Sequence, residues 1–141
     1  MIKYKEDNDL KDKIKVDIKI LNKYKSSYLQ KVESYNKYLE KLSFDNELVE
    51  RLIKTIKIFN QQIQKIDNNI ERLNNLLEQK IITRKEISKY NYKFIQINQN
   101  YKKNLMVGEE IMIEYIEKIS EENNMKEKEI VSNNNTLLIS E

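Results

Sequence analysis

Hydrophobic residues between positions 49 and 77 recur at spacings that alternate between three and four. The residues between them are mostly Lys, Glu, Asn, Gln, Arg and Thr, so a helix formed here has one narrow apolar face. A pattern that persists over four heptads is typical of a helix that packs lengthwise against another helix. The predicted coiled-coil seam consists of Val49, Leu52, Ile56, Phe59, Ile63, Ile66, Ile70, Leu73 and Leu77.

A second pattern of the same kind lies earlier in the chain and predicts a helix over residues 9–42. Tyr24 and Tyr38 flank this pattern, and Lys25 is the polar residue that interrupts its spacing. A helix with such a seam can pack along the first one. Its apolar positions are Ile14, Ile18, Leu21, Tyr28, Val32, Tyr35, Leu39 and Leu42.

The segment between the two patterns predicts a turn near residues 43–46. Ser43 and Asp45 are small polar residues that can accept hydrogen bonds from the free amides of a new helix. Glu47 would place a favourable negative charge in the first turn of that helix. Because Gly and Pro are absent here, one continuous helix stays open as the alternative, and it would need a partner chain to cover its seam.

The second helix is predicted to run from residue 46 to about residue 120. Beyond Leu77 the apolar positions move sideways to a displaced frame, which we interpret as a stutter or stammer within one helix. Gly108, the single glycine, indicates either a helix boundary or a glycine tolerated inside a helix. The displaced frame contains Ile87, Tyr90, Phe94, Ile97 and Tyr101.

These patterns predict an all-α fold, a long antiparallel two-helix coiled coil with frayed ends. Residues 9–120 form the α-helical hairpin, residues 1–8 form a flexible N-terminus, and residues 121–141 form an acidic, disordered tail.

The first predicted helix is the shorter one, so it leaves the second half of the long helix poorly covered. We expect the aromatic residues there to form an exposed stripe that a partner protein can bind. The alternative is a core that the N-terminal segment or a second copy of the chain completes. The residues in question are Tyr90, Tyr92, Phe94, Tyr101 and Tyr115.

The composition argues against catalysis. The chain has no Cys and no His, so disulfides, thiolate chemistry and the commonest metal ligand are missing, and a single Gly cannot build a phosphate-binding loop. The glutamates at 109, 110, 114 and 117 are expected to form a solvated helix face and not a metal site. We therefore predict no catalytic, cofactor-binding or metal-binding residues, no cofactor and no enzymatic activity.

Charge and hydropathy bear on location and partners. The charged N-terminus lacks the apolar core of a signal peptide, and no apolar run approaches the length of about 20 residues that spans a bilayer. We expect a cytoplasmic protein that is peripheral to a membrane at most. Residues 46–107 carry 12 Lys and Arg against 6 acids, whereas residues 108–141 carry 3 against 9. The positive charge is interleaved with Glu, which does not favour nucleic-acid binding.

Two seamed helices, a turn near one third of the length and a short acidic end resemble the FliJ family of flagellar type III export proteins. The segment 109–116 is similar to the C-terminal pattern of that family, in which Met112, Glu114 and Tyr115 match and Ile113 replaces an acid. The turn segment 42–48 and the Gln/Asn-rich segment 60–64 also correspond in position.

The resemblance implies a monomeric, non-enzymatic coiled-coil stalk of the flagellar export apparatus. Its implied partners are the export ATPase, which the chain ends would meet, and the export gate and substrate chaperones; no small-molecule substrate is implied. Two alternatives stay open: a structural coiled-coil subunit of a eukaryotic cytoskeletal or tethering assembly, and a self-assembling homodimeric coiled coil. The candidate partner-binding residues are Tyr90, Phe94, Tyr101, Met112, Glu114 and Tyr115.

Overall fold

The structure, a computed structural model, describes the backbone of residues 7–41 and 46–140, and the side chains of 8–41 and 47–124. The described residues form three helices: α1 (Asp7–Lys41), α2 (Asn46–Glu78) and α3 (Arg84–Ser140). The prediction of an all-α fold is confirmed. The prediction of a two-helix hairpin is not, because the predicted long helix is divided into α2 and α3.

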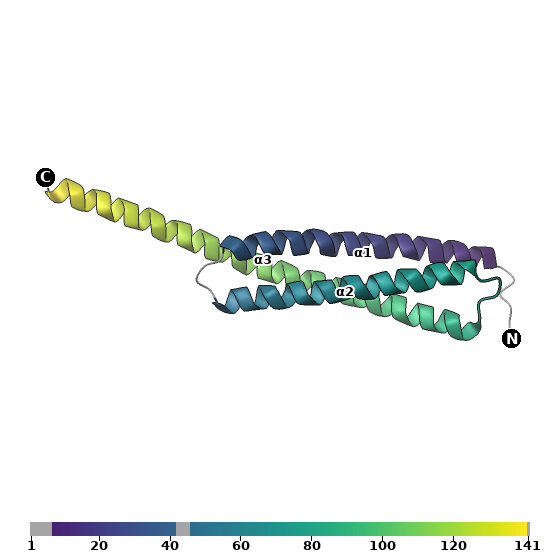
Figure 1. Ribbon diagram of the computed structural model, residues 1–141. Helices are drawn as coiled ribbons and strands as arrows, with labels where there is room; N and C mark the ends of the chain where they lie inside the picture. Colours follow the sequence, from purple (N-terminus) through teal and green to yellow (C-terminus); the bar gives the residue numbers. More distant parts are fainter. Residues whose placement is uncertain (1–6, 42–45, 141) are drawn as a thin grey trace.

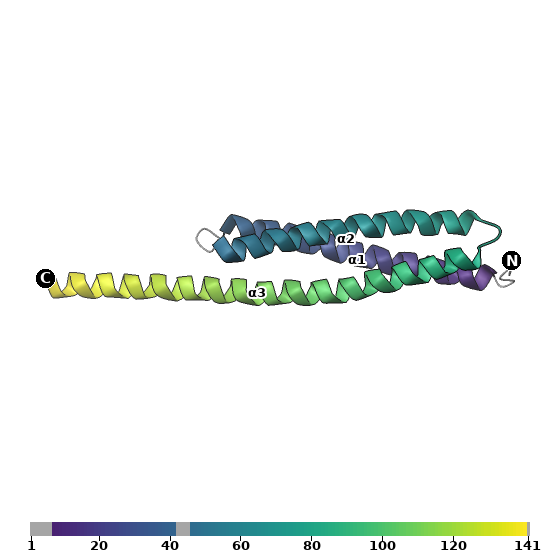
Figure 2. The same cartoon turned by 90° about the horizontal axis from the view of Figure 1, so that it is seen from below.

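The three helices run up, down and up along one another (Figure 1). α2 is antiparallel to α1, and α3 folds back along α2, so α3 runs parallel to α1 (Figure 2). Hydrogen bonds between α1 and α3 join residues that are 73 to 77 positions apart along the chain, from Lys13 near one end to Tyr28 at the middle of α1. This nearly constant offset means that the two helices keep one register.

Residues 79–83 separate α2 from α3, and hydrogen bonds at Thr83 explain why α3 begins there. The Thr83 hydroxyl accepts a hydrogen bond from the Glu86 amide at 3.2 Å, and Glu86 Oε1 accepts one from the Thr83 amide at 3.1 Å. This reciprocal pair is a capping box, which satisfies amides that no helical carbonyl reaches. Ile82 is buried beside it and anchors the connection in the core. The frame shift interpreted as a stutter is therefore a boundary between two helices.

α3 has an unbroken heptad pattern of its own. Its inward positions are 87, 90, 94, 97, 101, 104, 108, 111 and 115, spaced alternately by three and four. Tyr90, Ile97, Ile111 and Tyr115 on this line are buried. Asn104 and Gly108 occupy two of these positions, and because neither has an apolar side chain they interrupt the apolar pattern in the sequence. For this reason the sequence pattern makes residues 87–101 look like a continuation of the helix that contains the α2 seam.

α2 lies against both other helices, so its buried face is wider than a two-stranded seam. Leu52, Phe59, Ile66 and Leu73 are fully buried, whereas the other predicted seam residues of α2 are half-buried. A third line, spaced by seven, is also buried and includes polar side chains. It consists of Leu48, Thr55, Gln62, Asn69 and Leu76.

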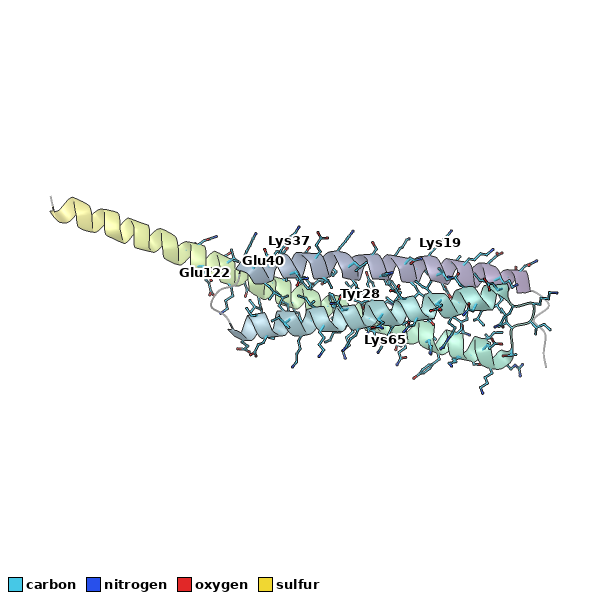
Figure 3. The ribbon with its side chains drawn as sticks, in the orientation of Figure 1. Lys19, Tyr28, Lys37, Glu40, Lys65 and Glu122 are labelled. Atoms are coloured by element: carbon cyan, nitrogen blue, oxygen red, sulfur yellow. The ribbon has the colours of Figure 1, made fainter. Side chains whose placement is uncertain are left out.

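Tyrosines of α1 fill the space between α1 and α3, whose backbones approach each other less closely than those of α1 and α2. Tyr24 stacks on Tyr101 with ring centroids 3.9 Å apart, and Tyr38 packs against Tyr115 at 4.5 Å. Tyr28 points into the bundle, whereas charged residues such as Lys19 and Lys37 point away from it (Figure 3). The solvated and apolar faces of α1 are thus separated as its pattern predicts.

Two predictions from the sequence concern residues at or beyond the limits of the described segments. The predicted turn near 43–46 falls on residues 42–45, which lie outside the described residues; α1 ends at Lys41 and α2 begins at Asn46. The sequence predicts an acidic, disordered tail over residues 121–141, whereas α3 continues as a helix through Ser140. Both views show this part of α3 running past the end of the α1–α2 pair (Figures 1 and 2).

Gly108 lies inside α3 and does not end a helix. A Cβ at this position would collide with the hydroxyl of Tyr35 and would lie 3.3 Å from Cζ of Phe59. The glycine therefore makes room for two aromatic rings from α1 and α2. This close packing offsets the cost of about 1 kcal/mol for a glycine inside a helix.

We predict that Thr83→Ala lowers the free energy of unfolding by about 1 kcal/mol, because the capping box is lost. Denaturant unfolding followed by circular dichroism measures this change. Ser88→Ala, at an exposed position in the next turn, is the control and should not lower the midpoint, because alanine favours a helix more than serine does. An equal effect of the two substitutions would contradict the capping role.

The capping box also leads us to predict how stability depends on pH. Hydrogen bonds from Thr83 hold the pKa of Glu86 below its usual value of 4.5, so its charge stabilises the fold above that pH. This contribution is lost as the pH falls through the native pKa. Glu86→Gln should therefore be less stable than the parent at neutral pH, and the difference should shrink below pH 4.5.

For Gly108 we predict a coupling with Tyr35. Gly108→Ala should destabilise the parent chain, although alanine favours a helix by about 1 kcal/mol, because the methyl group displaces the tyrosine ring. In a Tyr35→Phe background the hydroxyl is gone and the same change should be less harmful. A double-mutant cycle measures the coupling, and additive effects would contradict this account of Gly108.

Candidate functional site

The residues expected to bind a partner face the core of the bundle. Tyr90 and Tyr115 are buried, and Phe94, Tyr101 and Met112 pack partly buried against the same core. Glu114 forms an ion pair with Arg51 of α2. The expectation of an exposed aromatic stripe is wrong for these side chains, because α3 folds back and is covered by α1 and α2. Of the five aromatic residues in that expected stripe, Tyr92 is the exposed one, at 67%.

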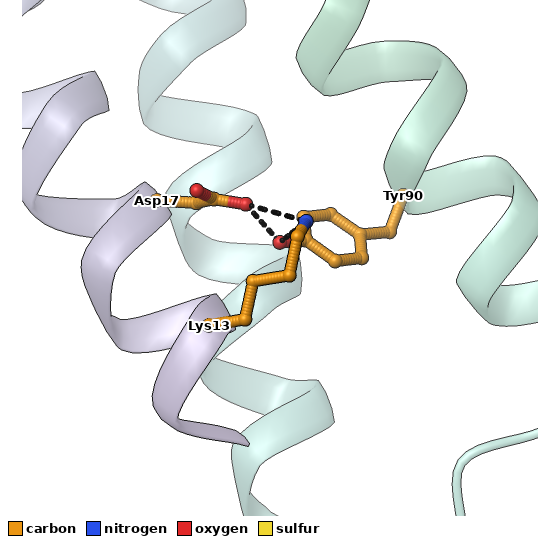
Figure 4. A network of polar contacts seen from close by, with 3 residues as sticks. All are labelled: Lys13, Asp17 and Tyr90. Carbon is orange, nitrogen blue, oxygen red and sulfur yellow. Dashed lines mark hydrogen bonds and ion pairs between the residues drawn. The ribbon is translucent and has the colours of Figure 1, made fainter. Parts of the chain in front are cut away.

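Tyr90 belongs to a polar cluster that joins α3 to α1 (Figure 4). Its hydroxyl donates a hydrogen bond to the buried carboxylate of Asp17, and Lys13 Nζ lies 3.2 Å from the same carboxylate oxygen. Lys13 also donates to the Tyr90 hydroxyl at 3.1 Å. Burial, and then the hydrogen bond to Asp17, raise the pKa of Tyr90 well above its usual value. The tyrosine therefore stays protonated and holds the two helices together.

The opposite side of α3 carries a second, outward apolar line. We name Tyr92, Ile95, Met106, Ile113 and Ile116 the outer stripe; they are 54 to 67% exposed. Residues 92, 106 and 113 share one position of a heptad, and residues 95 and 116 share another. Gln99, Lys102 and Glu109 fill the positions between them. The sequence contains this line, but the stronger inward line of α3 draws attention away from it.

An open groove adjoins the outer stripe where α1 and α3 lie together. Its volume is about 440 Å³, and Ile113 and Ile116 belong both to it and to the stripe. Tyr35 and Tyr38 contribute the α1 wall, so aromatic and aliphatic surface continues from the stripe into the groove. The groove is lined by Lys31, Ser34, Tyr35, Tyr38, Glu109, Met112, Ile113 and Ile116.

A second concave region lies between α2 and α3, nearer the α2–α3 connection. It is a cavity of about 250 Å³ lined by cations, amides and one aliphatic side chain. We name it the cationic pocket. Its lining residues are Lys65, Asn68, Asn69, Arg72, Lys93, Gln96 and Ile97. Apart from Ile97, which belongs to the displaced apolar frame, these residues carry no local signal in the sequence, because they are spread over two helices that only the fold brings together.

Neither a metal-binding cluster nor a membrane-spanning helix occurs in the described part of the chain. No cluster of three or more His, Cys, Asp or Glu there has a geometry that could hold a metal ion. None of the described helices combines the length and the apolar character that a bilayer crossing requires.

Comparisons with known proteins give no relative on which to base a function: no protein-family model, no curated protein and no solved structure matches the chain.

We predict that Tyr90→Phe lowers the free energy of unfolding by about 2 kcal/mol, because it removes a hydrogen bond to a buried carboxylate. Chemical denaturation measures the change. Tyr92→Phe removes the same hydroxyl from an exposed ring and serves as the control. If both variants unfold at the parent midpoint, the Asp17 cluster does not hold α3 in place.

Proposed function

We propose that this protein is a non-enzymatic coiled-coil component that binds other proteins through the outer face of α3. The observation that carries the proposal is the outer stripe, a line of five exposed apolar residues that Gln99, Lys102 and Glu109 interrupt, on a helix that already uses its other face for the bundle. A helix that is apolar on two faces is typical of one that packs against two partners.

The size of the stripe supports this proposal. From Tyr92 to Ile116 an α-helix rises by about 36 Å, which is long enough for a partner helix to dock over several turns. The adjoining groove extends the apolar surface sideways towards α1. The helical extension beyond the α1–α2 pair adds further length on the same helix.

As the particular role we propose a stalk of the flagellar type III export apparatus, which contacts the export ATPase, the export gate and substrate chaperones. The support is the resemblance of segment 109–116 to the FliJ pattern, together with an elongated helical rod. The exposed Ile113 and Ile116 lie in that segment. The fold differs from the two-helix form that the resemblance implies. A stalk of this kind acts by touching several ATPase subunits unequally, on the cytoplasmic side of the membrane.

A second candidate is self-association, which the order of charges along α3 favours. Lys102 and Lys103 precede the middle of the outer stripe, and Glu109 and Glu110 follow it. Two copies that pair their stripes in antiparallel orientation would place the lysines of one beside the glutamates of the other. In that case the chain forms a homodimer, and the partner copy covers the outer stripe. Such dimers could also be subunits of a larger structural rod.

The test combines two readouts on the full chain. We predict that the protein, added in substoichiometric amounts, raises ATP hydrolysis by the flagellar export ATPase of its own organism. The double variant Ile113→Gln, Ile116→Gln should lose most of this stimulation while its circular dichroism and unfolding midpoint stay unchanged. The control is Ile53→Gln, an equally exposed apolar residue on α2 outside the stripe.

Light scattering on the same samples separates the candidates. A monomer that stimulates the ATPase supports the stalk. A dimer that the double variant converts to a monomer supports self-association. No stimulation, and a parent chain that is monomeric with or without the two substitutions, would reject both roles for the outer stripe.

A further inference from the structure

The cationic pocket has an unbalanced charge. Lys65 and Arg72 of α2 and Lys93 of α3 line it, whereas no Asp or Glu of the described residues does. None of the three cations has an ion pair among the described residues. Most exposed cations on helices face bulk water, but these three converge on one cavity between two helices.

The surroundings of Lys93 reflect this imbalance. Burial, followed by the like charges of Arg72 and Lys89, lowers the pKa of Lys93. Glu86 is the carboxylate in the adjoining cavity, which Arg72 also lines. Glu86 accepts its hydrogen bonds from Thr83 in the capping box and does not line the cationic pocket. The positive charge in the pocket is thus left without a matching anion.

The floor of the pocket has unsatisfied polar atoms. Asn69 is 4% exposed, and neither its Oδ1 nor its Nδ2 has a hydrogen-bond partner among the described residues. One guanidinium nitrogen of Arg72, Nη1, is also buried without a partner. A buried amide or guanidinium nitrogen normally has a partner, because its hydration is lost on folding. Each of these atoms has almost no accessible surface, so a bound molecule reaches it only when the neighbouring side chains shift.

We propose that the cationic pocket binds a small phosphorylated molecule. Three convergent cations match a phosphate dianion better than a single carboxylate, and the planar guanidinium of Arg72 suits two phosphate oxygens at once. Asn69 and Gln96 offer donors and acceptors for hydroxyl groups of the organic part. The volume of about 250 Å³ lies below the range of about 300–1,000 Å³ for drug-sized ligands, which favours a small phosphate ester.

A purely structural role for Asn69 leads to a different expectation. A buried polar residue at a heptad position can serve only to set the register of packed helices. Such a role does not involve the lysines of the pocket, and it does not make phosphate binding depend on Asn69. An experiment can therefore distinguish a structural role of Asn69 from a role in phosphate binding.

The experiment is a calorimetric titration of the full chain with inorganic phosphate and with glycerol phosphate at constant ionic strength. We expect one saturable site for each. Arg72→Gln and Lys93→Gln should each weaken binding by about tenfold or more, because each removes a charged donor. The matched controls are Lys57→Gln on α2 and Lys103→Gln on α3, which remove the same charge from exposed positions outside the pocket and should change affinity by less than about twofold.

Asn69→Leu gives a second readout. It replaces an unsatisfied amide by an apolar side chain, so the melting temperature should rise while the affinity for glycerol phosphate falls. A rise in melting temperature with unchanged affinity would mean that Asn69 is structural. Absence of a saturable site, or equal losses in pocket and control variants, would overturn the proposal.

A vesicle titration identifies the source of the phosphate. Phosphatidylcholine vesicles with and without phosphatidic acid are compared for binding to the parent chain and to Arg72→Gln. Binding that requires both phosphatidic acid and Arg72 assigns the site to a lipid headgroup. Binding of glycerol phosphate without binding of these vesicles assigns it to a soluble ester.

Discussion

The structure depends on the tyrosine contacts that bridge α1 and α3. α1 and α2 pack closely through aliphatic side chains and through Tyr28 and Tyr35 on Phe59, but α3 lies farther from α1 and needs longer side chains to close the core. Stacking of Tyr24 on Tyr101 and packing of Tyr38 on Tyr115 provide this reach at two levels of the bundle. Each aromatic ring also brings a hydroxyl that must be satisfied.

For Tyr24 and Tyr28, polar residues of α3 meet that second requirement. Asn104 donates to the Tyr28 hydroxyl at 3.2 Å, and Asn98 accepts from Tyr24. Near the start of α3 the direction is reversed, since Tyr90 of α3 donates to Asp17 of α1. Gly108 completes the arrangement by making space for Tyr35. Polar and small residues in the inner line of α3 are therefore part of the core, and they fix its register against α1.

Once the inner face of α3 is engaged in this way, its remaining surfaces become informative. The outer stripe and the cationic pocket differ in chemistry and lie on different sides of the helix, the stripe apolar and exposed, the pocket charged and set between α2 and α3. The exposed stripe residues and the three cations of the pocket do not close the core, and the unpaired atoms of Asn69 and Arg72 carry a cost in stability. Features that a bundle does not need for folding are reasonable places to seek its function.

The sequence by itself determined the helical class, the ends of α1 and the start of α2 to within a few residues, and the inward face of each of these helices, because heptad spacing follows from the geometry of the helix alone. The spacing of Thr83 and Glu86 fits a capping box, but because apolar positions resume beyond it the sequence pattern indicates one continuous helix. Only the tertiary structure decided that α3 folds back, that Tyr90 and Tyr115 are core residues, and that Lys65, Arg72 and Lys93 converge. These outcomes depend on contacts between residues far apart in the chain, and a local pattern of polar and apolar positions does not specify them.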